Sequence, residues 1–287
     1  MTDCIVCGSN SFRELYVEEP YHFHECTSCR LLFINPLHFH TSEEKEEVFT
    51  DYNWAGTDRD RYDAQRARAM EKAKRRISFL QKNYGINIHR VLEIGAGLGG
   101  WCEAFQELGI YYLGVDIDRK AVESGASFGA NIIHGDITSP SFQLGTDKPY
   151  DMIFASQVIE HILNPRDFMD RIKPLLADNG ILYFDFPNPD GIIPKLKQIG
   201  LMKGRYEKEY RFLQPPWHFI AYRAPTIEYL LKAHTFELLY LRSWGNSHPV
   251  FGQLASFTRM HRLANTVMGT INRGSLSVAL AAKRMVF

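Results

Sequence analysis

From Val91 to its last residues, the chain alternates short apolar runs with segments of helical pattern, and this alternation constrains the fold strongly. The apolar runs are typical of strands buried on both faces of a sheet. Strands that alternate with helices form βαβ units, so the chain is predicted to be an α/β protein with a parallel, doubly wound sheet. The predicted strands cover 91–94, 111–116, 131–134, 151–155, 180–187, 236–244 and 276–284, and the predicted helices cover 99–108, 119–128, 163–176 and 225–234.

The remaining segments suggest a division into three parts. Residues 63–287 are predicted to form the main domain, which begins with a helix over 63–83. The apolar face expected for this helix consists of Ala67, Met70, Ala73, Ile77 and Leu80. Residues 37–62 are polar and acidic, as expected for a linker or lid. Two irregular stretches, 188–223 and 245–274, interrupt the alternation and are predicted to be insertions on the substrate side.

Residues 1–36 contain four of the five cysteines, as two CxxC pairs, Cys4 with Cys7 and Cys26 with Cys29. The 18 residues between the pairs fall within the spacing of four-cysteine zinc sites. Tetrahedral zinc takes four thiolates, which leaves no position for a substrate, so this segment is predicted to be a structural zinc ribbon. The neighbouring histidines are not needed as ligands and are expected at the surface: His22, His24, His38 and His40.

The charge balance argues against nucleic acid as a partner. Lys and Arg total 33, as do Asp and Glu, whereas a nucleic-acid-binding chain is commonly basic. Between Cys4 and Cys29 there is one basic residue, Arg13, among several glutamates, so the ribbon is a poor phosphate binder and is expected to pack on a neighbouring domain or cover the substrate. No apolar run approaches the roughly 20 residues that span a bilayer, and no signal-peptide pattern is present, so a cytoplasmic location is expected.

A glycine-rich turn, IGAGLGG, follows the first predicted strand. Glycine at Gly95, Gly97 and Gly99 permits a tight turn and lets a cofactor approach the backbone. With Gly100 the string also satisfies GxGxxG, so a dinucleotide site has to be considered. The glycines alone do not distinguish the two interpretations.

Three acidic residues accompany the glycine turn; an acid at the position of Asp116 is used by both cofactor classes, whereas Glu93 favours a positively charged cofactor over a dinucleotide. Asp116 ends the second strand, where a carboxylate can accept hydrogen bonds from two ribose hydroxyls. Glu93, two residues before the first glycine, would repel a pyrophosphate but suits a cation. Asp136 follows the third strand and is placed to accept a hydrogen bond from an adenine amino group.

The combined pattern, ExGxGxG, GVDID, GD and DMIFASQVIEHILNP, resembles the class I S-adenosylmethionine-dependent methyltransferases over residues 65–244 and the final strand. The tracts CTSCRLLFINP and HFIAYRAPTIEYLLKAHTF resemble a bacterial subgroup that modifies sugars and other small molecules, with Thr235 where a glycine is usual. The resemblance implies a Rossmann-like, seven-stranded sheet and S-adenosylmethionine as cofactor. It also implies cofactor contacts by Glu93, Gly95, Gly97, Gly99, Asp116, Ile117, Asp136, Ile137 and Gln157.

Two histidines are candidates for a catalytic base, because histidine's reference pKa of about 6.5 suits proton transfer near neutral pH. His161 follows the fourth strand, at the carboxyl edge where ligands bind in such sheets. His218 lies in the insertion after the fifth strand and is expected over the same edge. Packing and helix capping for His161, and a backbone hydrogen bond for His218, are the structural alternatives.

The favoured hypothesis is therefore methyl transfer to an oxygen, or with lower preference a carbon, of a small-molecule or sugar-like acceptor. The basic residues of 195–211 are most simply explained by a solvated helix face, but their position in the substrate-side insertion also fits a phosphorylated or nucleotide-linked acceptor. The alternatives are a zinc-ribbon RNA methyltransferase and a non-catalytic binding module on the same fold.

Overall fold

The computed structural model describes residues 3–35, 37, 44, 46–47, 59–145, 148–192, 194–195, 213, 218–244 and 276–283. The insertion predicted over 245–274 lies outside the described residues, as do most of the linker over 37–62 and most of the insertion over 188–223. Of the basic stretch 195–211, only Lys195 is described.

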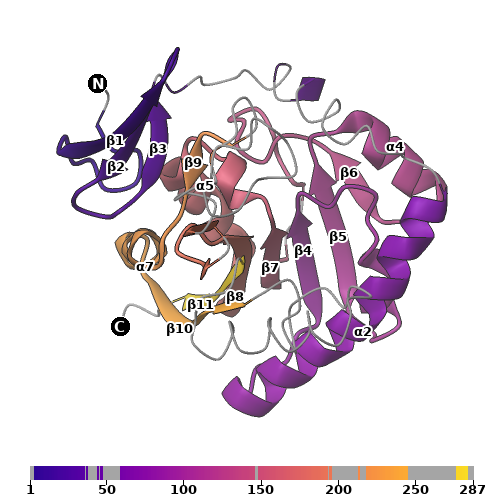
Figure 1. The fold of residues 1–287 in the computed structure, drawn as a ribbon. Coiled ribbons are helices and arrows are strands. Elements are labelled where there is room, and N and C mark those ends of the chain that lie inside the picture. Colours follow the sequence, from indigo (N-terminus) through magenta and orange to yellow (C-terminus); the bar gives the residue numbers. More distant parts are fainter. Residues whose placement is uncertain are drawn as a thin grey trace.

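A seven-stranded sheet forms the centre of the molecule, with strand order β10-β11-β8-β7-β4-β5-β6 (Figure 1). Its strands are β4 (Arg90–Ile94), β5 (Tyr111–Asp116), β6 (Ile132–His134), β7 (Tyr150–Ser156), β8 (Leu176–Pro187), β10 (Phe236–Trp244) and β11 (Leu276–Lys283). Strands β4 to β8 pair in parallel, as predicted. Strand β11 runs antiparallel to both β8 and β10, so the sheet is mixed at this edge.

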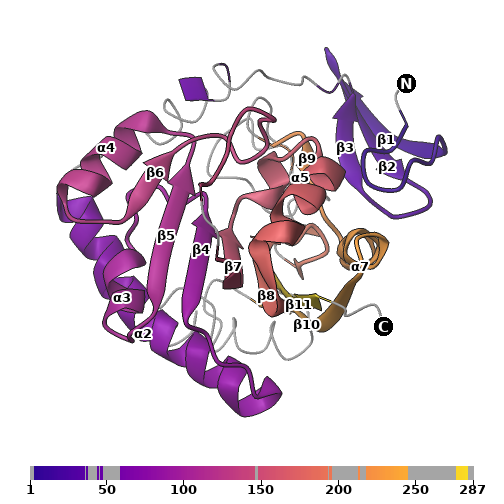
Figure 2. The ribbon, with the colours of Figure 1, turned by 180° about the vertical axis from the view of Figure 1, so that it is seen from behind.

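Helices cover both faces of the sheet, which confirms the doubly wound α/β architecture (Figures 1 and 2). On one face lie α2 (Arg59–Tyr84), α3 (Cys102–Gln106) and α4 (Arg119–Ser127), and on the other lie α5 (Pro165–Ile172) and α7 (Ala224–Ala233). Two short 3₁₀ helices, η2 (Ile159–His161) and η3 (Lys173–Leu175), join strands and helices. None of the described helices has both the length and the apolar character needed to cross a bilayer.

Side chains alternate between two hydrophobic cores along each central strand. In β4, Leu92 and Ile94 face the core under α5 and α7, whereas Val91 faces the core under α2, α3 and α4. This period of two is the geometry of a strand buried on both faces. It explains why the central strands could be predicted as uninterrupted apolar runs.

Three helices differ from their sequence predictions. The helix predicted over 163–176 ends at Ile172, because η3 follows it and β8 begins at Leu176 rather than at 180. Helix α3 begins at Cys102 rather than 99, because Gly97 and Gly99 have φ angles of +55° and +71°, which are incompatible with a right-handed helix. The buried face of α2 is formed by Tyr62, Ala69, Ala73, Arg76 and Leu80. Of the predicted face, Ala67 is exposed. The buried face of α2 therefore includes the charged Arg76 and does not coincide with the apolar face predicted from the sequence.

The N-terminal segment forms a second, antiparallel sheet of order β1-β2-β3-β9 (Figure 2). Strands β1 (Phe12–Glu18), β2 (Tyr21–Cys26) and β3 (Leu32–Asn35) come from the predicted ribbon. The fourth strand, β9 (Ile220–Ala221), comes from far along the chain, and it pairs with β3 through Ile220 opposite Phe33. The N-terminal sheet is thus completed by a strand of the main domain.

Candidate functional site

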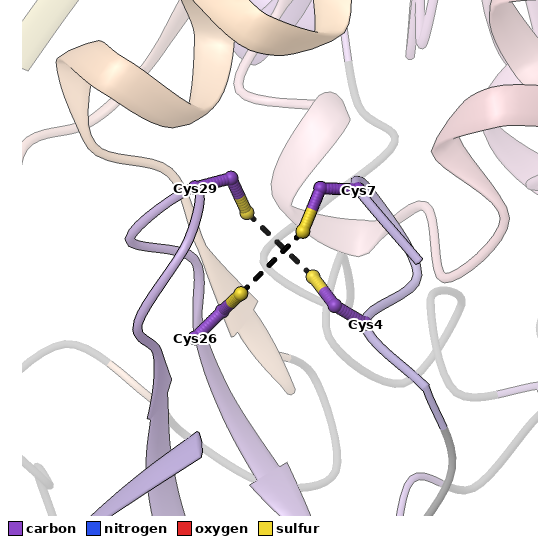
Figure 3. Close-up of side chains that lie close together, drawn as sticks. All are labelled: Cys4, Cys7, Cys26 and Cys29. Atoms are coloured by element: carbon purple, nitrogen blue, oxygen red, sulfur yellow. Dashed lines mark hydrogen bonds between the residues drawn. The ribbon is translucent and has the colours of Figure 1, made fainter. Parts of the chain in front are cut away.

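The four ribbon cysteines converge on one point (Figure 3). Cys4 and Cys7 lie in the turn before β1, Cys26 ends β2, and Cys29 lies in the turn that follows β2. The Sγ atoms are 3.6 Å apart between Cys4 and Cys29 and 3.5 Å apart between Cys7 and Cys26. Four thiolates bound to zinc at about 2.3 Å lie roughly 3.8 Å from one another in tetrahedral geometry, so the cluster fits a zinc ion closely. Its closed donor set fits a structural ion.

The ribbon is attached to the segment that carries His218. Besides the β3–β9 pairing, the Ile34 amide donates to the Phe219 carbonyl at 2.9 Å. The Thr226 hydroxyl of α7 donates to the Cys29 carbonyl at 2.8 Å. These bonds fix the backbone immediately after His218 to the turn that carries Cys29.

The expectation that the ribbon histidines lie at the surface is wrong for one of those described. His24 is only 2% exposed and stacks on Phe33, with ring centroids 5.4 Å apart. His22 is half-buried, and its Nδ1 lies 3.0 Å from the Glu14 carboxylate. His38 and His40 are outside the described residues.

The glycine turn leaves β4 at the carboxyl edge of the sheet, and its three candidate glycines all have positive φ angles. A Cβ on Gly95 would lie 2.3 Å from Val158 Cγ2, and one on Gly99 would lie 2.7 Å from the Cβ of Ala130. A Cβ on Gly97 would meet nothing within 4 Å. Gly95 and Gly99 are therefore required by packing, whereas Gly97 leaves open space where a cofactor can reach the backbone.

Asp116 closes the turn at the end of the adjacent strand, β5. Its carboxylate accepts hydrogen bonds from the Gly97 amide at 2.6 Å and from the Asp118 amide at 2.8 Å. Each carboxylate oxygen has a second lone pair, so the group can still accept from two hydroxyls. Burial raises the pKa of Asp116, while the two amides partly offset this effect.

Glu93 lies beneath the turn, inside β4, and is 3% exposed. The Tyr112 hydroxyl donates to its carboxylate at 2.5 Å. Burial raises the pKa of Glu93 from 4.5 to about 8, despite this hydrogen bond and the nearby Arg76 cation. A cationic group bound above the turn would favour the ionised carboxylate.

The other predicted cofactor residues surround the same edge. Asp136 follows β6 and accepts from the amide and hydroxyl of Thr138, at 2.8 and 2.6 Å. Ile117 is half-buried after β5, and Ile137 is buried. Gln157, after β7, has a φ angle of +57° and donates to Asp185 at 3.0 Å. The parallel strands thus bring the predicted set to one edge of the sheet.

The two candidate histidines, 57 positions apart in the sequence, are neighbours in space, with ring centroids 4.6 Å apart. His161 ends η2, three residues after Val158, which contacts the glycine turn. Burial, together with the neighbouring His161, lowers the pKa of His218 from 6.5 to about 3, so that its imidazole is neutral near pH 7. Glu160 completes the group, and burial raises its pKa to about 8.

Residues 61–241, more than half of the chain, match the family model described as a methyltransferase domain. The chain belongs to this methyltransferase family. Its expected class I fold is thereby confirmed.

The sequences of curated relatives align with part of this methyltransferase. The ubiquinone biosynthesis O-methyltransferase of Caulobacter sp. (strain K31) is 27% identical over 133 residues, 45% of this chain and 51% of that protein. The protein of the same description from Glaesserella parasuis is 28% identical over 156 residues, 49% of this chain and 66% of that protein. The alignments span between half and two thirds of these relatives.

Solved structures share the fold of the methyltransferase over most of its length. The plantazolicin methyltransferase BpumL, in complex with a pentazolic desmethylPZN analog and SAH, has a TM-score of 0.54 at 19% identity, covering 84% of this chain and 91% of that chain. A SAM-dependent methyltransferase from Thermotoga maritima has a TM-score of 0.52 at 15% identity, covering 85% and 100%. At these identities the likeness concerns the fold.

Three residues of this candidate site have no sequence motif that points to them: Tyr112, Asp185 and Arg76. Tyr112 bonds Glu93, and Asp185, near the end of β8, accepts from Ser156, Gln157 and Tyr183. Arg76 of α2 lies 3.9 Å from Asp185, with its guanidinium 4.3 to 4.7 Å from the ring centroids of Trp101, Phe154 and Tyr183. An acid inside the apolar run ILYFDFP was the one available signal, because charged residues are rarely buried without a partner.

Proposed function

We propose that the protein transfers a methyl group from S-adenosylmethionine to an oxygen of a small-molecule, sugar-like acceptor, with carbon as the less favoured target. The observation that carries this proposal is the contact between His161 and His218 beside the glycine turn. The pair offers two imidazoles at the carboxyl edge of the sheet, where ligands bind in folds of this kind.

The residues around the turn fit the cofactor by charge and shape. Glu93 lies where it can attract the cationic methionine part, and Gly97 leaves room for close approach. Asp116 is proposed to accept from the ribose hydroxyls, and Asp136 with Ile137 to contact the adenine. Gly95, Gly99, Ile117 and Gln157 are proposed to complete the lining. When bound, the cofactor supplies an electrophilic methyl carbon attached to a sulfonium.

His161 and His218 are proposed to activate the acceptor hydroxyl. Burial keeps the His218 imidazole neutral but makes it a weak base, because its pKa falls to about 3. His218 is therefore suited to accept a hydrogen bond from the acceptor hydroxyl, and uptake of the proton is assigned to His161. Because most of the acceleration in methyl transfer can come from alignment, the pair also serves to hold the acceptor oxygen in place. A partly buried site further excludes water from the reacting groups.

The names of the relatives favour a small acceptor. The curated relatives act in ubiquinone biosynthesis as O-methyltransferases, and BpumL is described as a plantazolicin methyltransferase. The sugar-like acceptor is proposed from the tracts that resemble the sugar-modifying subgroup, and a phosphorylated or nucleotide-linked form from the basic stretch 195–211. A soluble cytoplasmic enzyme with structural zinc in the ribbon fits the same proposal.

Alanine substitutions of the histidine pair test the proposed role. His161→Ala and His218→Ala should each lower turnover about 100-fold or more, since general acid–base assistance contributes roughly 10²–10⁴-fold. Affinity for S-adenosylhomocysteine, measured by calorimetry, should change less than about threefold, because all the proposed cofactor contacts except Gln157 belong to β4, β5, β6 or the turns that follow them. His89→Ala, at the exposed opposite edge of the sheet, is the control and should retain activity. Full turnover in both pair variants would rule out the role.

A further inference from the structure

A second group of metal-ligand side chains lies outside the cysteine cluster. One ligand atom each from Glu160, His161 and His218 lies within 4.8 Å of the other two. Two of these residues belong to η2 at the end of β7, and the third precedes β9. Ligands bound to a metal at about 2.1 Å lie roughly 3.0–3.4 Å apart, so rotation about side-chain bonds is enough to close the group.

The Glu160 carboxylate is an independent sign of a missing cation. It is 2% exposed, and neither of its oxygens accepts a hydrogen bond from any other described residue. No Lys or Arg ion pair to it is found within the described part of the chain. The nearby Tyr222 hydroxyl, also buried, has no partner either. A buried carboxylate in such surroundings is strongly stabilised by a bound cation.

We propose that Glu160, His161 and His218 bind a divalent first-row metal ion, separate from the ribbon zinc, which in turn binds the acceptor oxygen. Two imidazoles and one carboxylate form a donor set that suits Zn²⁺, Mn²⁺ or Fe²⁺ and leaves positions open for a substrate. The four thiolates of the ribbon, in contrast, fill the coordination of their ion. The proposed metal binding depends only on the positions of these three residues. The proposed catalytic role of the metal rests, in addition, on the proposed methyl transfer.

The ion would act as a Lewis acid. A hydroxyl bound to a divalent cation loses its proton to water more readily, because the cation stabilises the resulting negative charge. The oxygen then forms a bond to the methyl carbon, the bond between that carbon and sulfur breaks, and its electron pair remains on sulfur. In this role the two imidazoles activate the acceptor through the ion instead of taking up the proton themselves.

Cobalt titration of the zinc-loaded protein tests the site directly. The protein is first brought to one zinc per chain by metal analysis, so that the ribbon is filled, and Co²⁺ is then added. One further equivalent should bind with visible d–d absorption and without the thiolate charge-transfer band of a cysteine site. Glu160→Gln and His218→Ala should each weaken this binding by more than roughly 100-fold, since even indirect partners of a metal contribute 10–100-fold.

A matched control separates this site from a rival on the ribbon surface. Glu14, His22 and His24 also lie within 4.8 Å of one another, and the first two are accessible. His22→Ala should leave cobalt binding unchanged. The proposal would be overturned if the zinc-loaded protein bound no further equivalent of Co²⁺. It would also be overturned if His22→Ala abolished this cobalt binding while His218→Ala retained it. Retained zinc and S-adenosylhomocysteine affinity in each variant verify that it is folded.

Activity with and without metal separates the site from the proposed function. With a methylatable acceptor, Mn²⁺ or Co²⁺ should raise turnover of the zinc-loaded protein at least about tenfold, and His218→Ala should abolish this response. Equal turnover with and without the second metal would overturn its catalytic role while leaving methyl transfer intact. Cobalt binding without cofactor binding would instead contradict the proposed function and leave the metal site standing.

Discussion

Glu93 lies inside β4 at the base of the glycine turn, where Tyr112 holds its carboxylate and burial raises its pKa to about 8. Arg76, Asp116 and Asp185 also act on it, the first lowering its pKa and the two acids raising it. A carboxyl group with a raised pKa binds its proton more tightly in the folded state than in the unfolded state. It therefore stabilises the fold fully below its unfolded pKa of 4.5, and this contribution is lost as the pH rises through about 8.

Glu93→Gln should flatten the pH dependence of stability. Glutamine keeps an acceptor for Tyr112 but has no proton to lose, so the decline in unfolding free energy between pH 5 and 8 should shrink by roughly 3–5 kcal/mol. Urea unfolding at several pH values measures this change. Glu123→Gln, on the exposed surface of α4, is the control. An unchanged slope in Glu93→Gln would show that the carboxyl group is not desolvated.

Gly97 and Gly85 form a matched pair for testing the cofactor site. Both have positive φ angles, +55° and +68°, and a Cβ on either meets nothing within 4 Å. Replacement by alanine should therefore cost each about 1–2 kcal/mol of stability through backbone strain. Only Gly97→Ala should also weaken S-adenosylhomocysteine binding, by more than tenfold, which calorimetry measures. Equal affinities in the two variants would remove Gly97 from the site.

Among individual residues of the candidate site, those that lie at or directly after the end of a recognisable strand could be predicted from the sequence. Asp116 ends one strand that is recognisable as an apolar run, and the glycines follow another. Because the carboxyl ends of adjacent parallel strands lie at the same edge of a sheet, these residues are expected to be neighbours. Arg76 was not predictable, because nothing in the helical pattern distinguishes it from Arg75, which is exposed. Its burial depends on three aromatic rings from other elements.

Among the elements, β9 links the ribbon to the candidate site. It pairs with β3, and His218 precedes it by two positions. The pairing joins segments about 190 residues apart, and a two-residue strand carries too little pattern to be recognised in a sequence. The direction of β11 was equally unpredictable, because an apolar run does not encode whether its strand runs parallel or antiparallel.

Loss of the ribbon zinc should therefore impair the histidine pair while sparing the cofactor site. Cys26→Ser removes one of four ligands, and we expect zinc content to fall well below one per chain and turnover to fall more than tenfold. S-adenosylhomocysteine affinity should stay within about threefold, because the glycine turn lies on β4. Cys102→Ser, in the core under α3, should retain its zinc. Unimpaired turnover in zinc-free protein would contradict this link.

Over the whole molecule, the ribbon and the main domain share a core. Cys4, Cys26 and Cys29 belong to the same buried cluster as Phe184 of β8 and Leu230 of α7. The division at residues 36 and 62 stays a prediction, and in the described structure the cysteine ribbon packs into the hydrophobic core on one face of the central sheet. The βαβ alternation predicts that consecutive strands lie side by side on one side of β4, as β4, β5 and β6 do. It does not predict that β7 pairs on the other side of β4, or that β11 lies between β8 and β10.

The central claim is that the edge of this sheet binds S-adenosylmethionine, and calorimetric titration of the zinc-loaded protein tests it most directly. Micromolar binding of S-adenosylmethionine and S-adenosylhomocysteine, with none of NAD, is the predicted result. Asp116→Ala, verified as folded by its zinc content and thermal melting, should lose that binding. Binding of NAD alone, or of no adenosyl compound, would contradict the account.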